Sequence, residues 1–339
     1  MHRDFHIKTM LLFTLASAAV STLISCGGGG GSNGTTSAAS APQTYTAAAM
    51  AGELVNYTVD PTAKTYSYTI VESQFGLTGK TGTGTLIANS DGSFTPSNDS
   101  NARVRILPNG LLLGVIRENF GSGLATSPVI GMSNPDTSLA SIAGTYNYVG
   151  RGCTTTCGTV FGTIQVSASG TWTFCGSGNL TAGACVTGST GTGSMTALGG
   201  GKFQLNVGAT TIGTAIAFNS AGENVMIVDL KDPRTPAAGG LGKGIIVGSS
   251  QLAINTASTD GKWLAMGTNG SVFTFTAAGS TLTAITLNGA PATGSSTITA
   301  NSPWTGIGLA NTSGHGILAG NGVYAYEKAG YAEIGIKLN

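Results

Sequence analysis

The sequence predicts an all-β fold built from antiparallel meanders that form sandwich-like or barrel-like domains. Charged residues make up 9% of the chain, against about 25% in typical soluble domains. Glycine supplies 54 of the 339 residues, and much of the remainder is Thr, Ser, Ala, Val and Ile, a mixture suited to strands and turns rather than to long charged helices. Two further observations, alternating apolar residues and turn dipeptides, support the same fold class.

Apolar and polar residues alternate in several short runs. In residues 64–73, Tyr66, Tyr68 and Ile70 are separated by Ser67 and Thr69. A period of two places one face of a strand in the core and the other in water. The same alternation occurs at Trp172 and Phe174, at Phe203, Leu205 and Val207, and at Ile334, Ile336 and Leu338.

Turn dipeptides separate these runs. Asn-Gly and Asp-Gly accept positive φ at both central positions of a two-residue hairpin loop. Beyond the N-terminal segment, no stretch shows a sustained helical period with caps, so we expect a series of hairpins. The dipeptides begin at Asp91, Asn109, Asp260, Asn269, Asn288 and Asn321.

An imperfect internal repeat indicates two related β units. The run GTLIANSDGSFT at 84–95 resembles GTIQVSASGTWT at 162–173. The segment 133–137 breaks the strand pattern with Pro and Asp. We therefore expect a first β domain over 44–132, a linker at 133–137 and a larger domain over 138–339. Sandwiches and barrels both remain open, because both solve the problem of exposed strand edges with short amphipathic strands.

Residues 1–25 have the layout of a secretory signal. A basic start with Arg3 and Lys8 precedes an apolar core from Met10 to Ile24, which is the pattern of an export signal. Fifteen residues reach only about 22 Å as a helix, short of the ~30 Å hydrocarbon layer. The segment is therefore expected to direct export rather than to remain as a membrane span.

The signal ends in Leu23-Ile24-Ser25-Cys26, which resembles the lipobox of Gram-negative bacterial lipoproteins. That resemblance implies acyl chains on Cys26, and two or more chains hold a protein stably on a membrane. Gly27 is not the aspartate that retains such lipoproteins at the inner membrane, so the resemblance implies the outer membrane, on its periplasmic or cell-surface side. Residues 26–43 are rich in Gly and Ser, as expected of a flexible tether.

The charge balance excludes one class of partner. Of 15 basic and 14 acidic residues, Arg3, Lys8 and Asp4 lie in the signal, which leaves 13 of each in the mature chain. No run of like charge provides a footprint for nucleic acid. The expected partners are the membrane, reached through Cys26, and a glycan, an apolar ligand or an envelope protein.

Four cysteines follow Cys26, at positions 153, 157, 175 and 185. An exported chain meets an oxidising compartment, so an even set predicts two disulfides. Three pairings are possible, and we favour Cys153 with Cys157 and Cys175 with Cys185 because each closes a short loop at a hairpin end. A zinc site would normally show C-x₂-C pairs, which are absent from this sequence, and no metal is expected.

Catalytic signals are sparse. His315 is the only histidine beyond the signal, which removes most designs that use a histidine base, and no catalytic residue or cofactor is assigned. Paired carboxylates remain an alternative, because a carbohydrate-active hydrolase needs two acids and no histidine. The candidate acids in or beside apparent strands are Glu72, Glu118, Glu223, Asp229 and Glu333.

The three tryptophans are weak candidates for ligand binding. Flat aromatic faces stack on sugars and apolar molecules, but aromatic residues at period two more often fill a core. Trp172 and Trp263 fit the core reading, and Trp304, which follows Pro303 in a polar loop, is expected to be the most exposed. The sequence thus favours a non-catalytic binding or structural role in the envelope, with the hydrolase or a self-assembling surface subunit as alternatives.

Overall fold

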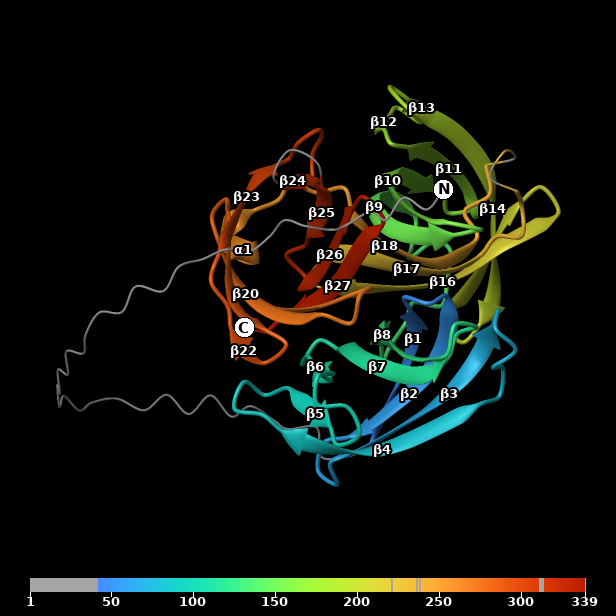
Figure 1. The fold of residues 1–339 in the computed structure, drawn as a ribbon. Helices are drawn as coiled ribbons and strands as arrows, with labels where there is room; N and C mark the ends of the chain where they lie inside the picture. Colours follow the sequence, from blue (N-terminus) through green and yellow to red (C-terminus); the bar gives the residue numbers. More distant parts are fainter. Residues whose placement is uncertain (1–41, 221, 236, 238, 311–313, 339) are drawn as a thin grey trace, which may run out of the picture. The chain divides into compact units, whose positions relative to one another are not determined.

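The computed structural model describes residues 42–339 except 221, 236, 238, 311–313 and 339, and confirms the all-β class (Figure 1). The strands form three antiparallel sheets with barrel-like connectivity, where the internal repeat indicated two related units. The expected signal, Cys26 and nearly all of the tether lie outside the described residues. Within them, no helix is long and apolar enough to cross a membrane.

The first sheet is a nearly closed ring of eight strands. Its order is β5-β4-β3-β2-β1-β8-β7-β6, and a bridge from Phe94 to Val104 links the two ends. The strands are β1 (Gln43–Ala49), β2 (Glu53–Asp60), β3 (Thr65–Ser73), β4 (Thr81–Ala88), β5 (Phe94–Pro96), β6 (Arg105–Ile106), β7 (Leu111–Asn119) and β8 (Leu124–Met132).

Side chains also connect strands of the first sheet across the ring. They do so where the short end strands β5 and β6 do not extend along the full length of β4 and β7. The Tyr68 hydroxyl, on β3, donates to Glu118 Oε1 at 2.9 Å and lies 3.3 Å from the Arg117 carbonyl, both on β7. Lys80 forms an ion pair with the other oxygen of Glu118. These contacts therefore link β3 and Lys80 to β7 through side chains.

The second sheet is a closed eight-stranded barrel. Its ring runs β10-β11-β14-β15-β16-β17-β18-β9, and β12 and β13 form a separate small hairpin. The strands are β9 (Gly144–Cys153), β10 (Cys157–Val166), β11 (Thr171–Gly176), β12 (Leu180–Thr181), β13 (Ala184–Cys185), β14 (Ser189–Gly199), β15 (Lys202–Val207), β16 (Thr210–Ser220), β17 (Glu223–Lys231) and β18 (Lys243–Ser250).

Two disulfides confirm the expected pairing. Cys153 is bonded to Cys157 across the β9–β10 hairpin. Cys175, at the end of β11, is bonded to Cys185 in the small hairpin. Both therefore lie at the same end of the second barrel, where β9 ends, β10 begins and β11 ends.

The third sheet also closes into a ring. Its chain of strands runs β20-β19-β27-β26-β25-β24-β23-β21-β22, and a further pairing of β20 with β21 closes it. The elements are α1 (Thr256–Thr259), β19 (Gly261–Gly267), β20 (Val272–Ala278), β21 (Thr281–Leu287), β22 (Ala290–Pro291), β23 (Ser295–Ala300), β24 (Gly308–Ala310), β25 (Gly314–Leu318), β26 (Val323–Lys328) and β27 (Tyr331–Lys337).

Each ring has its own apolar interior, and a fourth cluster lies between the rings. That shared core combines outward-facing residues of all three sheets, such as Leu54, Ile227 and Ile336. In β17, Ile227 packs into the shared core while Val228 packs into the barrel interior. Strands at this contact are therefore buried on both faces, unlike the one-faced burial that alternating runs predict.

Five of the six turn dipeptides lie in hairpin loops between strands, but Asn288-Gly289 alone has positive φ at both positions. Asn288 and Gly289 have φ values of 49° and 82°, so both turn positions between β21 and β22 use the left-handed region that this hairpin type requires. In the dipeptides that begin at Asp91, Asn109, Asn269 and Asn321, the glycine alone has positive φ. At Asp260-Gly261, the glycine is instead the first residue of β19.

Candidate functional site

The second barrel encloses a cavity of about 350 Å³. Its wall is mainly apolar and comes from strands on all sides of the ring. Trp172 and Phe174 of β11 form one side, and Met226, Val228 and Leu230 of β17 form another. The other lining residues are Tyr148, Thr159, Val160, Phe161, Ile164, Gly176, Ser177, Ser189, Leu205, Ile212, Arg234, Gly239, Gly240, Leu241, Ile246 and Gly248.

Strand alternation places these side chains inside. Val228 and its neighbours two residues away belong to the interior cluster of the barrel, as period-two geometry requires. The indole of Trp172 donates to the Ser194 carbonyl at 3.0 Å. Its N–H group is therefore satisfied within the wall, and the ring presents carbon to the cavity.

The cavity occupies the half of the barrel that carries both disulfides. Gly176, Ser177 and Ser189 line it at the disulfide-bonded loop, and Leu241 lines it from the β17–β18 connection. The interior cluster also contains Tyr146, which does not line the cavity. Side chains thus fill one part of the barrel and leave space in the other.

Among the described residues that line the cavity, Arg234 is the one with a charged side chain, and it forms an ion pair with Asp232. Arg234 donates from Nη2 to Asp232 Oδ2 at 2.7 Å and from Nε to Oδ1 at 2.9 Å. Burial alone would raise the pKa of Asp232, but the hydrogen bonds from Arg234 and from the Leu241 amide lower it. The pair is therefore ionised and internally neutralised, so the cavity suits an uncharged apolar molecule.

The three candidate tryptophans lie in different places. Trp172 lines the cavity. Trp263 is buried inside the third sheet, where it packs on Phe275 with the ring centroids 6.3 Å apart. Trp304 is half-buried, stacks on Phe161 and donates from its indole to Asn147 Oδ1 at 2.9 Å. They form no common surface.

His315 is held by its neighbours. Its Nδ1 lies 2.6 Å from Glu327 Oε1, and its ring stacks on Phe161 with the centroids 3.5 Å apart. Phe161 of β10 also packs against the shared core between the rings, so this contact joins the second and third sheets. The arrangement serves packing between sheets.

The five candidate acids are distributed over four locations. Glu118 binds Lys80 in the first sheet, Glu223 accepts from the Asn321 amide at 3.1 Å, and Glu333 accepts from two tyrosines in the third sheet. The other two, Glu72 and Asp229, lie at the contact of the first sheet with the second. None of the five lines the barrel cavity, and the described residues contain no group of three or more metal-ligating side chains.

Sequence reasoning missed most of the cavity wall. Met226, Val228 and Leu230 alternate at period two within β17, but the intervening positions are buried too, so the alternation is hidden. Glu53, which reaches the same contact as Asp229, was also missed because it begins a strand with no distinctive motif.

No protein-family model matches the chain, and no curated protein matches it. One solved structure with a similar chain is a double mutant of the vaccine antigen transferrin binding protein B from Haemophilus parasuis. The matched region has 12% sequence identity and covers 84% of this chain and 65% of that one, which is less than two thirds of its length. The TM-score is 0.22, and a likeness at that level carries no inference about fold or function.

Proposed function

We propose that this protein is a lipid-anchored protein of the bacterial outer membrane whose second barrel binds a small, uncharged apolar ligand. The observation that carries the binding role is the cavity of about 350 Å³ with an apolar wall. Ligand sites are typically concave, mainly apolar and roughly 300–1,000 Å³ in volume. Anchoring would hold the barrel on the periplasmic or the cell-surface side of that membrane.

Comparison with the third barrel supports this role. An eight-stranded barrel has an interior just wide enough for side chains to fill, or to hold one small ligand. In the third barrel, Trp263, Phe275 and Tyr324 pack together in the interior. In the second barrel, Gly248 and Ser177 face the space instead, so residue size leaves room that the strand number alone would not provide.

Gly248 offers a direct test of the cavity. A Cβ atom at this position would lie 3.4 Å from the nearest atom, the Asn147 carbonyl oxygen, which is an ordinary contact. A longer side chain would extend into the cavity, because Gly248 pairs with Tyr148 and Met226, two other wall residues. Gly248→Leu should therefore fill the site, and Gly248→Ala should leave most of it open.

The measurement is titration with the uncharged apolar dye N-phenyl-1-naphthylamine, followed by dye fluorescence and by energy transfer from the tryptophans, of which Trp172 lines the cavity. We expect saturable binding to the wild-type chain and to Gly248→Ala. Gly248→Leu should weaken binding by roughly tenfold or more, equivalent to about 1.4 kcal/mol. Absence of saturable binding to the wild type, or equal binding to Gly248→Leu, would contradict the proposed site.

The anchoring part of the proposal rests on Leu23-Ile24-Ser25-Cys26, which lies outside the described residues. We expect metabolic labelling with palmitate to mark the wild-type protein, and the protein to sediment with outer membranes. Cys26→Ala should abolish the label and shift the protein to the soluble exported fraction. Label that persists in Cys26→Ala would rule out this anchor without affecting the cavity.

A further inference from the structure

Strand β17 has a second face, opposite the one that lines the cavity. Its even-numbered residues Val228 and Leu230 line the cavity. Asp229, between them, points the opposite way and lies opposite Thr214 of β16 in the sheet register. The outward side of this cavity wall therefore faces the first sheet.

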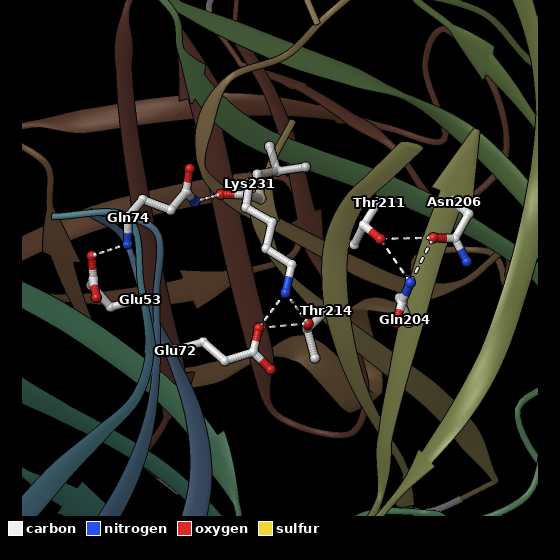
Figure 2. Close-up of polar contacts among 9 residues, drawn as sticks. Glu53, Glu72, Gln74, Gln204, Asn206, Thr211, Thr214 and Lys231 are labelled. Atoms are coloured by element: carbon white, nitrogen blue, oxygen red, sulfur yellow. Dashed lines mark hydrogen bonds and ion pairs between the residues drawn. The ribbon is translucent and has the colours of Figure 1, made fainter. Parts of the chain in front are cut away.

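Polar side chains of the first sheet meet β17 at this point (Figure 2). Glu72, near the end of β3, binds Lys231 and accepts from Thr214 Oγ1 at 2.9 Å. The Gln74 side chain donates to the carbonyl of Leu230, which joins the first sheet directly to a cavity-lining residue. We call Glu53, Glu72, Asp229, Lys231 and Lys243 the junction cluster.

The two sheets are close at this junction. A Cβ atom added to Gly52, just before β2, would lie 2.6 Å from the Gly244 nitrogen of β18 and 3.3 Å from the Leu230 carbonyl oxygen. Nothing larger than glycine fits there without movement. A change in the separation of β2 and β17 must therefore move backbone that also forms the cavity wall.

The junction cluster contains more carboxylates than cations. Lys231, from β17, is engaged by Glu72 of β3. Lys243, from β18, donates to the Gln74 carbonyl at 3.1 Å and lies 4.3 Å from the centroid of the Phe75 ring. The facing residue of β16, Thr214, is neutral, so the junction cluster has three acids and two lysines. Arg151 of β9 lies on the same face two strands away, because it pairs with Ile245, which pairs with Asp229.

Glu53 and Asp229 are the two acids of the junction cluster that are buried and not fully hydrogen-bonded. They are 0% and 1% exposed, and Glu53 Oε2 and Asp229 Oδ1 have no hydrogen-bond partner among the described residues. An ionised carboxylate that is buried and unpaired is costly. Both side chains are therefore more stable in the neutral, protonated form.

The expected titration follows from this burial. Burial raises the pKa of Glu53 to about 7, although hydrogen bonds from Ser73 and the Gln74 amide and the charge of Lys243 oppose the shift. Burial, followed by repulsion from Glu53 and Glu72, raises the pKa of Asp229 above its usual range against the attraction of Lys231. Both acids are neutral in mildly acidic solution, and Glu53 ionises near neutrality.

We propose that the junction cluster regulates the cavity, so that the β17 wall stays in place while Glu53 and Asp229 are both protonated, and ionisation of Glu53 loosens the wall and weakens ligand binding. The inference rests on the proposed binding function. Ionisation of Glu53 introduces a buried negative charge that requires water. Separation of β2 from β17 would admit that water, and it would displace Val228 and Leu230.

The test measures the affinity for N-phenyl-1-naphthylamine between about pH 5.5 and 8.5, a range that spans the Glu53 transition. Wild-type affinity should fall by roughly fivefold or more as the pH rises, the lower end of typical coupling between sites. Glu53→Gln keeps a neutral side chain of similar shape and should hold the acidic-pH affinity throughout. Glu223→Gln removes an acid from the far end of the same strand and should behave as wild type.

The outcomes separate the two proposals. No dye binding at any pH overturns the binding function itself. Dye binding with a constant wild-type affinity, or an equal pH dependence in Glu53→Gln and wild type, overturns the regulation and leaves the binding function standing. Circular dichroism at each pH identifies a variant that has failed to fold. If Glu53→Gln fails, the Trp172 emission of an otherwise wild-type chain with Trp263 and Trp304 replaced by Phe decides the question. An emission that stays constant across the pH range would overturn the regulation.

Discussion

Glu333 should make the stability of the third barrel depend on pH. Its carboxylate is buried in the ring and accepts hydrogen bonds from the hydroxyls of Tyr324 and Tyr331, the latter at 2.7 Å. Burial raises the pKa of Glu333 to about 7 from an ordinary value of 4.5, although both hydrogen bonds act in the opposite direction. The folded protein therefore holds this proton more tightly than the unfolded chain does.

The sign and the size of the effect follow by linkage. Between pH 4.5 and about 7 the native state binds more protons than the unfolded state at this position, so the free energy of unfolding falls as the pH rises. Each pKa unit corresponds to about 1.4 kcal/mol, which gives a loss of about 3 kcal/mol over this window. The contribution is fully present below pH 4.5 and gone above about 7.

Glu333→Gln removes the titration and retains an acceptor for the two tyrosines. We expect its free energy of unfolding, relative to wild type, to rise by about 3 kcal/mol from acidic to neutral pH. Urea denaturation followed by Trp263 fluorescence, in a chain with Trp172 and Trp304 replaced by Phe, reports on the same ring. Glu223→Gln in that background is the control, and a difference between Glu333→Gln and its parent that stays constant with pH would refute the reasoning.

Two further predictions concern the second barrel. Phe203 is fully buried in the interior of this barrel. Phe203→Ala should therefore lower the free energy of unfolding by about 3–5 kcal/mol in urea denaturation. A loss below about 1 kcal/mol would show that this part of the barrel is not packed as described. The Cys175–Cys185 disulfide spans a sequence separation of 10, so replacing both residues by Ser should cost about 2–3 kcal/mol on the chain-entropy estimate; unchanged stability under non-reducing conditions would argue against the bond.

The sequence was sufficient for the local elements. Asn288-Gly289 marked a hairpin because few other residues tolerate positive φ at both positions, and the short spacing of the cysteines favoured the pairing that the structure shows. The three-ring arrangement was harder to predict. Leu111, Leu112 and Leu113 form a continuous apolar run because Leu112 faces the interior of the first ring and its neighbours face the shared core.

The site depended on contacts between distant segments. Glu53 and Asp229 come from strands of different sheets, and neither has a local pattern that points to the other. The cavity was hidden for a different reason, because it arises where side chains are small. Gly248 reads in the sequence as a weak strand residue, and only the closed ring shows that it faces space.

Substitutions at Gly248 can also distinguish a binding site from a packing defect. Gly248→Leu should bury a leucine side chain in the cavity, which contributes about 1.5–3 kcal/mol, and should remove the backbone entropy cost of glycine in a strand, roughly 0.5–1 kcal/mol. We therefore expect this variant to unfold at a higher urea concentration than the wild type while it loses affinity for the dye.

If the cavity is kept for binding at the expense of stability, Gly248→Leu should raise the stability to urea and lower the affinity for the dye. Gly248→Ala is the matched control: it gains part of the backbone term, fills little of the cavity and should retain dye binding. Lower stability of Gly248→Leu than of Gly248→Ala would mean that the barrel cannot accommodate the added side chain. The space beside Val228 and Leu230 would then be too small for the ligand proposed for it.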